Sequence, residues 1–221
     1  MALGGYRNAA DLPQVIPVFP LDGLLLLPHG QLPLNIFEPR YLNMIDDAMA
    51  GDRMIGMVQT RPGGERTRPI LASVGCAGRI TSFSETGDGR YIITLTGVCR
   101  FETGDELPMQ TPYRQVRARF ADFEDDLKPQ GDDEGFDRVR LLGALKAYLD
   151  RRSLAVDWET AKGAPVEALV NSLSMALPFE PAEKQALLEA PTVLDRRAAL
   201  IALLEIDTGR ADEDDDPPFM H

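Results

Sequence analysis

Cysteine and histidine are scarce in this sequence, since its 221 residues contain only two of each. Cys76 and Cys99 belong to no CxxC motif, which argues against a disulfide framework and against a cysteine zinc site. His29 lies in a Pro-His-Gly turn and His221 is the last residue, so few imidazoles can ligate a metal or act as a catalytic base. We therefore expect no cofactor, and the cysteine content fits a reducing, cytoplasmic setting.

Long apolar runs are also missing. The longest one, residues 24–27, ends at Pro28, far short of the roughly 20 residues that a membrane helix needs. The first residues show no apolar stretch of the kind that a secretion signal has. The sequence therefore predicts neither export nor a membrane partner.

A basic excess is absent as well, because 23 Lys and Arg residues face 35 Asp and Glu residues, for a net charge of −12. Residues 122–137 hold eight acidic residues and one basic residue, and residues 211–221 hold five acidic residues and no basic one. These two segments carry the whole excess, so the rest of the chain is balanced. Proteins that bind nucleic acid usually carry a basic surface, which makes a nucleic-acid partner a poor fit.

The amino-terminal half has the alternation and the turn residues of a β-protein. Prolines separate short β-rich pieces in the first forty residues. Pro39 at a first helical position, apolar residues at helical spacing and Gly51 as a stop predict a helix over 39–50. Further along we expect a strand, an exposed loop, a hairpin around Asp88-Gly89 and a last strand, at 53–59, 60–69, 70–102 and 113–123.

After residue 137 the apolar period changes from two to between three and four residues, which predicts amphipathic helices that share a core. The change across one acidic linker marks a boundary. We predict four parts: a flexible N-terminus (1–12), a β-rich subdomain (13–123), a helical subdomain (124–209) and an acidic disordered tail (210–221).

Several blocks resemble the amino-terminal domain of Lon proteases. They include Ile16-Pro17-Val18-Phe19-Pro20-Leu21, Ile36-Phe37-Glu38-Pro39-Arg40-Tyr41 and Asp88-Gly89-Arg90-Tyr91. The helical half, with Lys184-Gln185 and Leu187-Leu188-Glu189, is similar to stand-alone Lon-domain proteins. The resemblance covers about 13–208 and implies an α+β fold, in which a PUA-like mixed β-barrel with a short helix precedes a C-terminal helical bundle.

The resemblance also implies a role in recognising protein substrates. No GxxxxGK[ST] loop occurs, and too few residues follow position 209 for a peptidase domain, so we predict a non-catalytic protein-binding module. Its expected partners are unfolded or partly folded proteins, with a protease or a chaperone if it acts as an adaptor. The sequence leaves the client and the oligomeric state open.

Binding an unfolded chain requires exposed apolar side chains and open strand edges. The proline-broken segment supplies the candidate contacts Phe19, Leu25, Leu27, Ile36 and Phe37. A scaffold role is predicted for the adjoining block of Glu38, Pro39, Arg40 and Tyr41. Here Glu38 and Pro39 favour the start of the helix, Tyr41 packs inward, and Arg40 pairs with a carboxylate or with strand carbonyls.

Other readings of the sequence stay open at this point. An RNA-binding module would use the arginines at positions 61, 66, 68 and 79. A small hydrolase would need Cys76 or Cys99 beside His29, and the two cysteines lie equally far from the turn at 87–88, which allows the thiols to be neighbours. Weaker candidates are a Ser–Lys pair, from Ser172 or Ser174 with Lys184, and a metal site at the paired acids Asp46-Asp47 or Asp125-Asp126.

Overall fold

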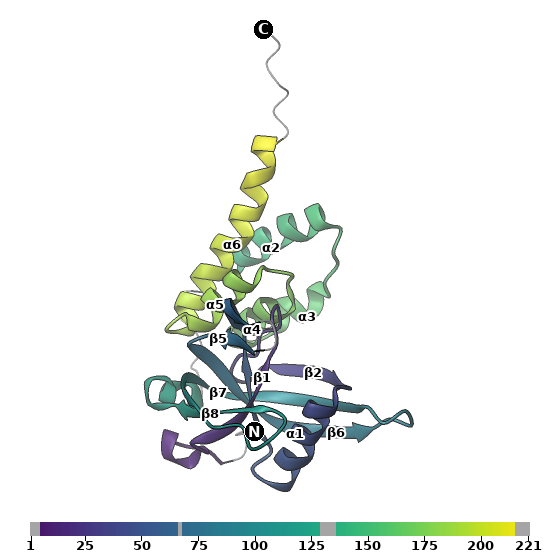
Figure 1. Ribbon diagram of the computed structural model, residues 1–221. Helices are drawn as coiled ribbons and strands as arrows, with labels where there is room; N and C mark the ends of the chain where they lie inside the picture. Colours follow the sequence, from purple (N-terminus) through teal and green to yellow (C-terminus); the bar gives the residue numbers. More distant parts are fainter. Residues whose placement is uncertain (1–4, 66–67, 129–135, 215–221) are drawn as a thin grey trace.

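The computed structural model describes residues 5–65, 68–128 and 136–214. A large mixed sheet forms the amino-terminal part (Figure 1). Its strands pair in the order β2 (Gln31–Ile36), β7 (Tyr91–Glu106), β6 (Val74–Glu85), β3 (Met54–Val58), β1 (Val15–Pro20) and β8 (Arg114–Arg119). β7 also pairs with β8, so five of these strands close into a ring and β2 lies outside it. Closure pairs both sides of each strand in the ring.

Helix α1 (Pro39–Ala50) follows β2, and its bounds confirm the helix predicted at 39–50. Pro39 occupies the first helical turn, where the missing amide hydrogen costs nothing. The helix buries Tyr41, Met44, Ile45 and Ala48 on one face. That face packs into the main core, so α1 is held against the sheet by apolar contacts.

A second, two-stranded sheet stands where an exposed loop was predicted at 60–69. It consists of β4 (Thr60–Glu65) and β5 (Arg68–Leu71), with an irregular register between Arg61 and Gly64. Gly63 and Gly64 both have positive φ, which an L-residue adopts only with strain. The prediction of a loop was wrong because these glycines and the flanking prolines hide the strand pattern, while the pairing itself comes from the backbone.

The amino-terminal residues also differ from the prediction of a flexible segment over 1–12. A short 3-10 helix, η1 (Ala9–Asp11), is closed by a capping box between Asn8 and Asp11. Leu12 is buried in the barrel, and Ala9 N donates to Glu124 Oε1 at 2.8 Å. From Ala9 onward the segment is therefore part of the fold.

Five helices form the carboxyl-terminal part of the described chain. They are α2 (Arg138–Arg152), α3 (Trp158–Gly163), α4 (Val166–Ala176), α5 (Pro181–Glu189) and α6 (Val193–Asp214). They stand on the barrel, and α6 runs away from it (Figure 1). Because α6 continues past Gly209 to Asp214, the predicted start of a disordered tail at 210 was wrong. Residues 215–221 and 129–135 of the predicted acidic segments lie outside the described residues.

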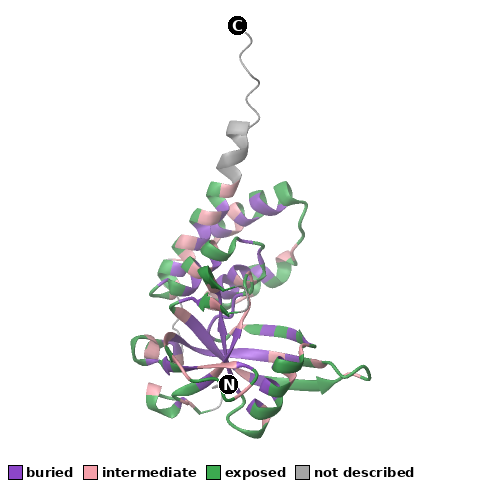
Figure 2. Cartoon of the chain, in the orientation of Figure 1, coloured by how far each residue is buried: buried purple, intermediate pink, exposed green. Residues whose placement is uncertain are grey.

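Buried residues occupy both the barrel and the helices (Figure 2), and the apolar ones among them form two clusters. The smaller cluster fills the barrel around Ile16, Phe101 and Val116. The larger one runs from the outside of the barrel into the helices and contains both Leu26 and Leu187. Residues 24–27, one of the short β-rich pieces between the early prolines, form no strand; residues 25–27 are buried in the larger cluster. The two predicted subdomains therefore share one core.

A buried ion pair joins the two parts of the fold. Arg100 of β7 binds Asp126 of the 3-10 helix η2 (Ala121–Leu127) through Nη2–Oδ1 at 2.8 Å and Nε–Oδ2 at 2.9 Å. Its guanidinium also donates to three carbonyl oxygens at the end of α5 and just after it, those of Leu188, Ala190 and Pro191. Both side chains are less than a tenth exposed. One arginine thus connects the barrel, η2 and the helices.

Candidate polypeptide-binding groove

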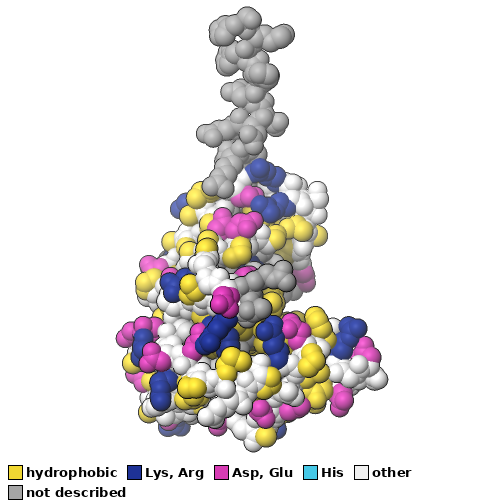
Figure 3. All heavy atoms as spheres, in the orientation of Figure 1, with side chains coloured by type: hydrophobic (Ala, Val, Ile, Leu, Met, Phe, Trp, Pro, Cys, Tyr) yellow, Lys and Arg dark blue, Asp and Glu magenta, His cyan; other side chains and the backbone are white. Residues whose placement is uncertain are grey.

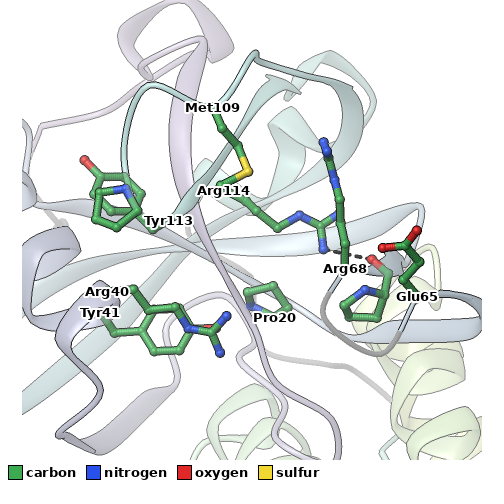
Figure 4. Close-up of a pocket in the computed structure, with 10 residues that line it drawn as sticks. Pro20, Arg40, Tyr41, Glu65, Arg68, Met109, Tyr113 and Arg114 are labelled. Atoms are coloured by element: carbon green, nitrogen blue, oxygen red, sulfur yellow. Dashed lines mark hydrogen bonds between the residues drawn. The ribbon is translucent and has the colours of Figure 1, made fainter.

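An open groove of about 600 Å³ lies beside the amino-terminal end of α1 (Figure 4). Three stretches of chain surround it: the end of β1 with the start of α1, the β4–β5 hairpin, and the segment that leads into β8. Its lining combines aromatic rings, prolines and a methionine with three arginines and one glutamate. The residues are Pro20, Arg40, Tyr41, Glu65, Arg68, Pro69, Met109, Pro112, Tyr113 and Arg114.

The start of α1 forms the inner wall. The Tyr41 ring packs against Phe19 with ring centroids 4.2 Å apart, and the Arg40 guanidinium lies 4.5 Å over the Tyr41 ring. Arg40 Nε donates to Glu38 Oε2 at 2.9 Å. Glu38 accepts no helix-capping hydrogen bond, so its carboxylate serves Arg40 rather than the helix end. The block predicted as scaffold therefore also borders the groove.

The hairpin forms the outer wall and is tied to the barrel through one carboxylate. Glu106 of β7 accepts from Arg68 Nη2 at 3.0 Å and from Arg114 Nε at 3.1 Å. Arg114 Nη1 also donates to the carbonyl oxygen of Pro69 at 2.8 Å. The two arginines lower the pKa of the Glu106 carboxyl, Arg114 by more than Arg68. Glu106 therefore stays ionised and holds the wall in place.

Tyr113 closes one end of the groove and is fixed by α1. Its hydroxyl donates to Asp47 Oδ2 at 2.6 Å. Burial, and then this hydrogen bond, raise the pKa of Tyr113 to about 12, and burial also raises the pKa of Tyr41. Both rings are therefore neutral at physiological pH. Neutral rings beside guanidinium groups suit binding of apolar side chains and of carbonyl or carboxylate oxygens.

Of the five predicted contact residues, the structure buries four. Phe19, Leu25, Leu27 and Ile36 are between 0% and 7% exposed and belong to the main core. The prediction of these four as surface contacts was wrong because neither alternation along a strand nor a short apolar run between prolines tells which side the rest of the fold covers. Phe37 is 64% exposed and lies just outside β2.

The groove residues that sequence reasoning missed lie mainly in the segment 107–114. Met109 is 60% exposed there, between a strand end and Pro112. An exposed methionine among prolines, followed by Tyr113 and Arg114, is a signal that could have pointed to this stretch. The β4–β5 hairpin had no such sequence signal, because it reaches the groove only when the strands of the barrel have paired.

The arginines of the RNA-binding alternative do not form one surface. Arg61 donates to the carbonyl oxygen of Leu71, Arg68 pairs with Glu106, and Arg79 donates to the Tyr6 hydroxyl. Arg66 lies outside the described residues. On the face shown in Figure 3, basic and acidic side chains are interspersed rather than gathered by sign. That face gives no continuous path for phosphates.

The cysteines do not meet, contrary to the arrangement that their spacing allowed. Thr86 N donates to Arg90 O, and Gly89 takes a positive φ of 79°, so the hairpin is centred on Asp88. Cys76 therefore lies opposite Arg100, and Cys99 lies opposite Ala77. A displacement of one residue sends the two thiols to opposite faces of the sheet, one into each apolar cluster.

The hydrolase alternative fails because neither thiol is hydrogen-bonded to His29 and because both thiols are buried. His29 pairs with Glu167 of α4 (Nδ1–Oε1 3.0 Å), and this hydrogen bond raises the pKa of the imidazole. Neither thiol bonds to it; Cys76 Sγ and Cys99 Sγ donate to the carbonyl oxygens of Ala77 and Phe123. Both thiols are 0% exposed, and burial raises the pKa of each. A thiolate nucleophile is therefore disfavoured.

We expect both thiols of the folded protein to resist iodoacetamide at neutral pH and to react rapidly after unfolding. The reagent needs an accessible thiolate, and burial withholds both the access and the charge. Mass spectrometry of labelling time courses, in buffer and in guanidinium chloride, measures the difference. Rapid labelling of either cysteine in buffer would contradict the buried placement.

The weaker candidates fare no better. Lys184 Nζ donates to the carbonyl oxygen of Met175 at 3.0 Å, while Ser174 is buried and its hydroxyl has no hydrogen-bond partner in the described chain. Asp47 is taken by Tyr113. Within residues 5–65, 68–128 and 136–214, no three His, Cys, Asp or Glu side chains are grouped to hold a metal ion. None of the helices in these ranges is long and apolar enough to cross a membrane.

Comparison with known proteins identifies the family. The model of the ATP-dependent protease La (LON) substrate-binding domain matches residues 15–205. The chain belongs to this family. Lon protease 2 of Myxococcus xanthus is 29% identical over 218 residues, which cover 93% of this chain and 25% of that protein. The Lon protease of Anaeromyxobacter dehalogenans is 31% identical over 112 residues, or 50% of this chain and 13% of that protein.

Solved structures of Lon domains show the same fold. A Lon N-terminal domain protein from Xanthomonas campestris matches with a TM-score of 0.60 and 23% identity, covering 85% of this chain and 97% of that one. The N-terminal domain of a Mycobacterium avium complex Lon protease matches with a TM-score of 0.60 and 18% identity, over 86% and 98%. The chain spans a quarter or less of the two curated proteases. What it shares with them is the substrate-binding domain, which supports a role in substrate recognition.

Proposed function

We propose that this chain binds polypeptide segments of unfolded or partly folded client proteins in the groove beside α1. The observation that carries the proposal is the match to a substrate-binding domain over residues 15–205, in a molecule whose groove is open and lined for binding rather than for catalysis. Full-length Lon proteases act on proteins, so the occupant of such a groove is a stretch of polypeptide.

The groove has the chemistry that a varied set of clients requires. Met109 is flexible and exposed, and can fit side chains of different shapes. Pro20, Pro69 and Pro112 add rigid apolar surface. The guanidinium groups donate in several directions, to main-chain carbonyls or to carboxylates of the client. Such a surface favours broad recognition over one fixed sequence.

Removing one apolar and one basic side chain from the groove is expected to weaken client binding about tenfold, because a few central side chains carry most of a binding energy. The variant is Met109→Ser with Arg68→Ser, and the probe is fluorescein-labelled β-casein, an unfolded protein, followed by anisotropy. Both side chains are more than half exposed, so the fold should survive their loss.

A matched control is available on the helical part. Val139→Ser with Arg140→Ser also removes an exposed apolar residue, 83% exposed, and an exposed arginine that pairs with a glutamate. This variant is expected to bind β-casein as the parent does. Failure of the parent chain to bind β-casein, or equal losses in both variants, would contradict the proposed function.

We propose further that the chain works without enzymatic activity, in the cytoplasm, as a recognition module or as an adaptor that brings clients to a protease or a chaperone. The absence of a P-loop motif from the sequence supports this proposal. We also propose a PUA-like classification for the closed sheet. The ring of five strands, with α1 packed on its outside, supports it.

A further inference from the structure

Strand β2 is the open border of the large sheet. Each of the other five strands has a partner on both sides, whereas β2 pairs with β7 alone among the described strands. Figure 1 shows β2 along the outer border of the sheet, beside β7. One side of β2 therefore presents main-chain groups that the sheet does not use.

The hydrogen bonds next to β2 tell which residues carry these groups. Gly97 N donates to Gly30 O, which places Gly30–Gly97 at a hydrogen-bonded position; the return bond to Gly97 O comes from His29 N, because Gly30 N donates to Leu27 O in the preceding turn. Such positions alternate along an antiparallel pair. Leu32, Leu34 and Ile36 therefore exchange bonds with Leu95, Ile93 and Tyr91, as the register requires.

The other side of β7 agrees with this assignment. Thr86 N donates to Arg90 O. In this region the main-chain groups of the even-numbered residues of β7 therefore point toward β6, and those of the odd-numbered residues point toward β2. It follows that Gln31, Pro33 and Asn35 turn their main-chain groups outward. Proline at position 33 fits, because its missing N–H would point away from the ladder.

The outward groups are available, and Pro33 alone protects them. Gln31, Pro33 and Asn35 are exposed, and no main-chain hydrogen bond beyond the sheet uses them in the described chain. Exposed edges are commonly guarded by charged side chains, prolines or bulges; the six residues of β2 include one proline, Pro33, and no charge. The free edge offers the N–H groups of Gln31 and Asn35 and three carbonyl oxygens.

We propose that an extended segment of a client polypeptide adds to the sheet along this edge of β2. The inference rests on the proposed function, and it adds the form in which a client is recognised: as a strand, through its main chain. Main-chain pairing depends little on sequence, which suits a protein that meets many unfolded segments.

The surroundings of β2 leave room for such a segment. A cavity of about 530 Å³ is lined by His29, Gly30 and Gln31 at the start of β2 and by the first half of α4, which His29 contacts through Glu167. At the other end of the strand, Phe37 is 64% exposed and offers apolar surface to the incoming chain. Three residues further on, Arg40 borders the groove described above. Edge and groove are thus linked by a short stretch of chain.

A second copy of this chain fits the edge less well than a client does. In a two-fold pairing centred on Pro33, each proline would face the other, and both central N–H donors would be missing. Pairing with a client loses only the one donor of Pro33 and keeps its carbonyl as an acceptor. The edge therefore favours a different polypeptide over self-association.

The decisive variants remove or keep one outward N–H. Asn35→Pro deletes the donor at position 35 and leaves the bonds of Leu34 and Ile36 to β7 in place. Asn35→Ala removes the same side chain but keeps the N–H, so it is the matched control. We expect Asn35→Pro to weaken binding of fluorescein-labelled β-casein up to about tenfold, the effect of one lost hydrogen bond, and Asn35→Ala to bind nearly as the parent does.

Amide hydrogen exchange of the full chain, with and without β-casein, measures directly whether the outward N–H groups of β2 become hydrogen-bonded. In the free protein Leu34 should be protected and Asn35 should exchange fast, and β-casein should slow exchange at Gln31 and Asn35. A protected Leu34 in the proline variant confirms that it has folded. If β-casein binds but leaves both amides and the proline variant unaffected, strand addition is wrong and the groove alone accounts for binding. If β-casein does not bind the parent chain at all, the proposed function fails as well.

Discussion

A Gly97→Ala variant is expected to lose most of its stability, about 4 kcal/mol or more, because the new methyl group has no space. A Cβ atom on Gly97 would lie 2.0 Å from the carbonyl oxygen of Leu27 and 2.7 Å from its carbonyl carbon. Both are main-chain atoms of a buried segment, so no side-chain rotation relieves the clash. Chemical denaturation followed by circular dichroism, or failure to obtain folded protein, measures the effect.

The control for this variant is Gly87→Ala in the turn of the same hairpin. Nothing lies within 4 Å of a Cβ built on Gly87. Its stability should stay close to that of the parent. A Gly97→Ala protein as stable as Gly87→Ala would show that residues 27–30 do not lie against β7 as described.

Replacing Arg100 by methionine is expected to cost about 3–5 kcal/mol of stability, because it leaves the Asp126 carboxylate buried without its partner. Arg100 also supplies hydrogen bonds to the carbonyl oxygens of Leu188, Ala190 and Pro191, which would lose their donor. Thermal and urea denaturation of the variant should show the loss. The effect should reach the helices as well as the barrel, since one guanidinium serves both.

Two further variants separate burial of charge from loss of an ion pair. Adding Asp126→Leu to Arg100→Met removes the isolated carboxylate, so the double variant should be more stable than the single one. Arg119→Met breaks an exposed pair with Glu102 and should change little. An Arg100→Met protein as stable as Arg119→Met would contradict the buried connection between β7 and the helices.

Much of the fold could be predicted from local chemistry. The helix at 39–50 follows from Pro39, apolar spacing and Gly51, all of which act within one segment. The hairpin of β6 and β7 follows from Asp88-Gly89 between alternating residues. Features that depend on contacts between segments far apart in the sequence could not be predicted in this way. The β4–β5 hairpin and the burial of residues 24–27 belong to this class.

The candidate site was harder to predict than the fold because exposure is decided far away in sequence. Phe19 and Ile36 alternate as edge residues would, yet α1 and the main core cover them. Met109 and Arg68, which line the groove, lie about forty residues apart and meet only through the ring of strands. The hairpin is centred on Asp88 and not between residues 87 and 88. This shift of half a residue places Cys76 and Cys99 on opposite faces of the sheet.

The two walls of the groove differ in what fixes them. Apolar packing of Tyr41 on Phe19 holds the inner wall, whereas Glu106 holds the outer one through Arg68, whose side chain is 54% exposed, and Arg114. Dissolved ions weaken contacts between exposed charges over a screening length of about 8 Å at physiological ionic strength but leave apolar packing intact. Ionic strength therefore acts on the outer wall through the exposed Arg68–Glu106 pair and reaches the inner wall only at its Arg40–Glu38 pair, so the width of the groove becomes a property of the solution as well as of the sequence.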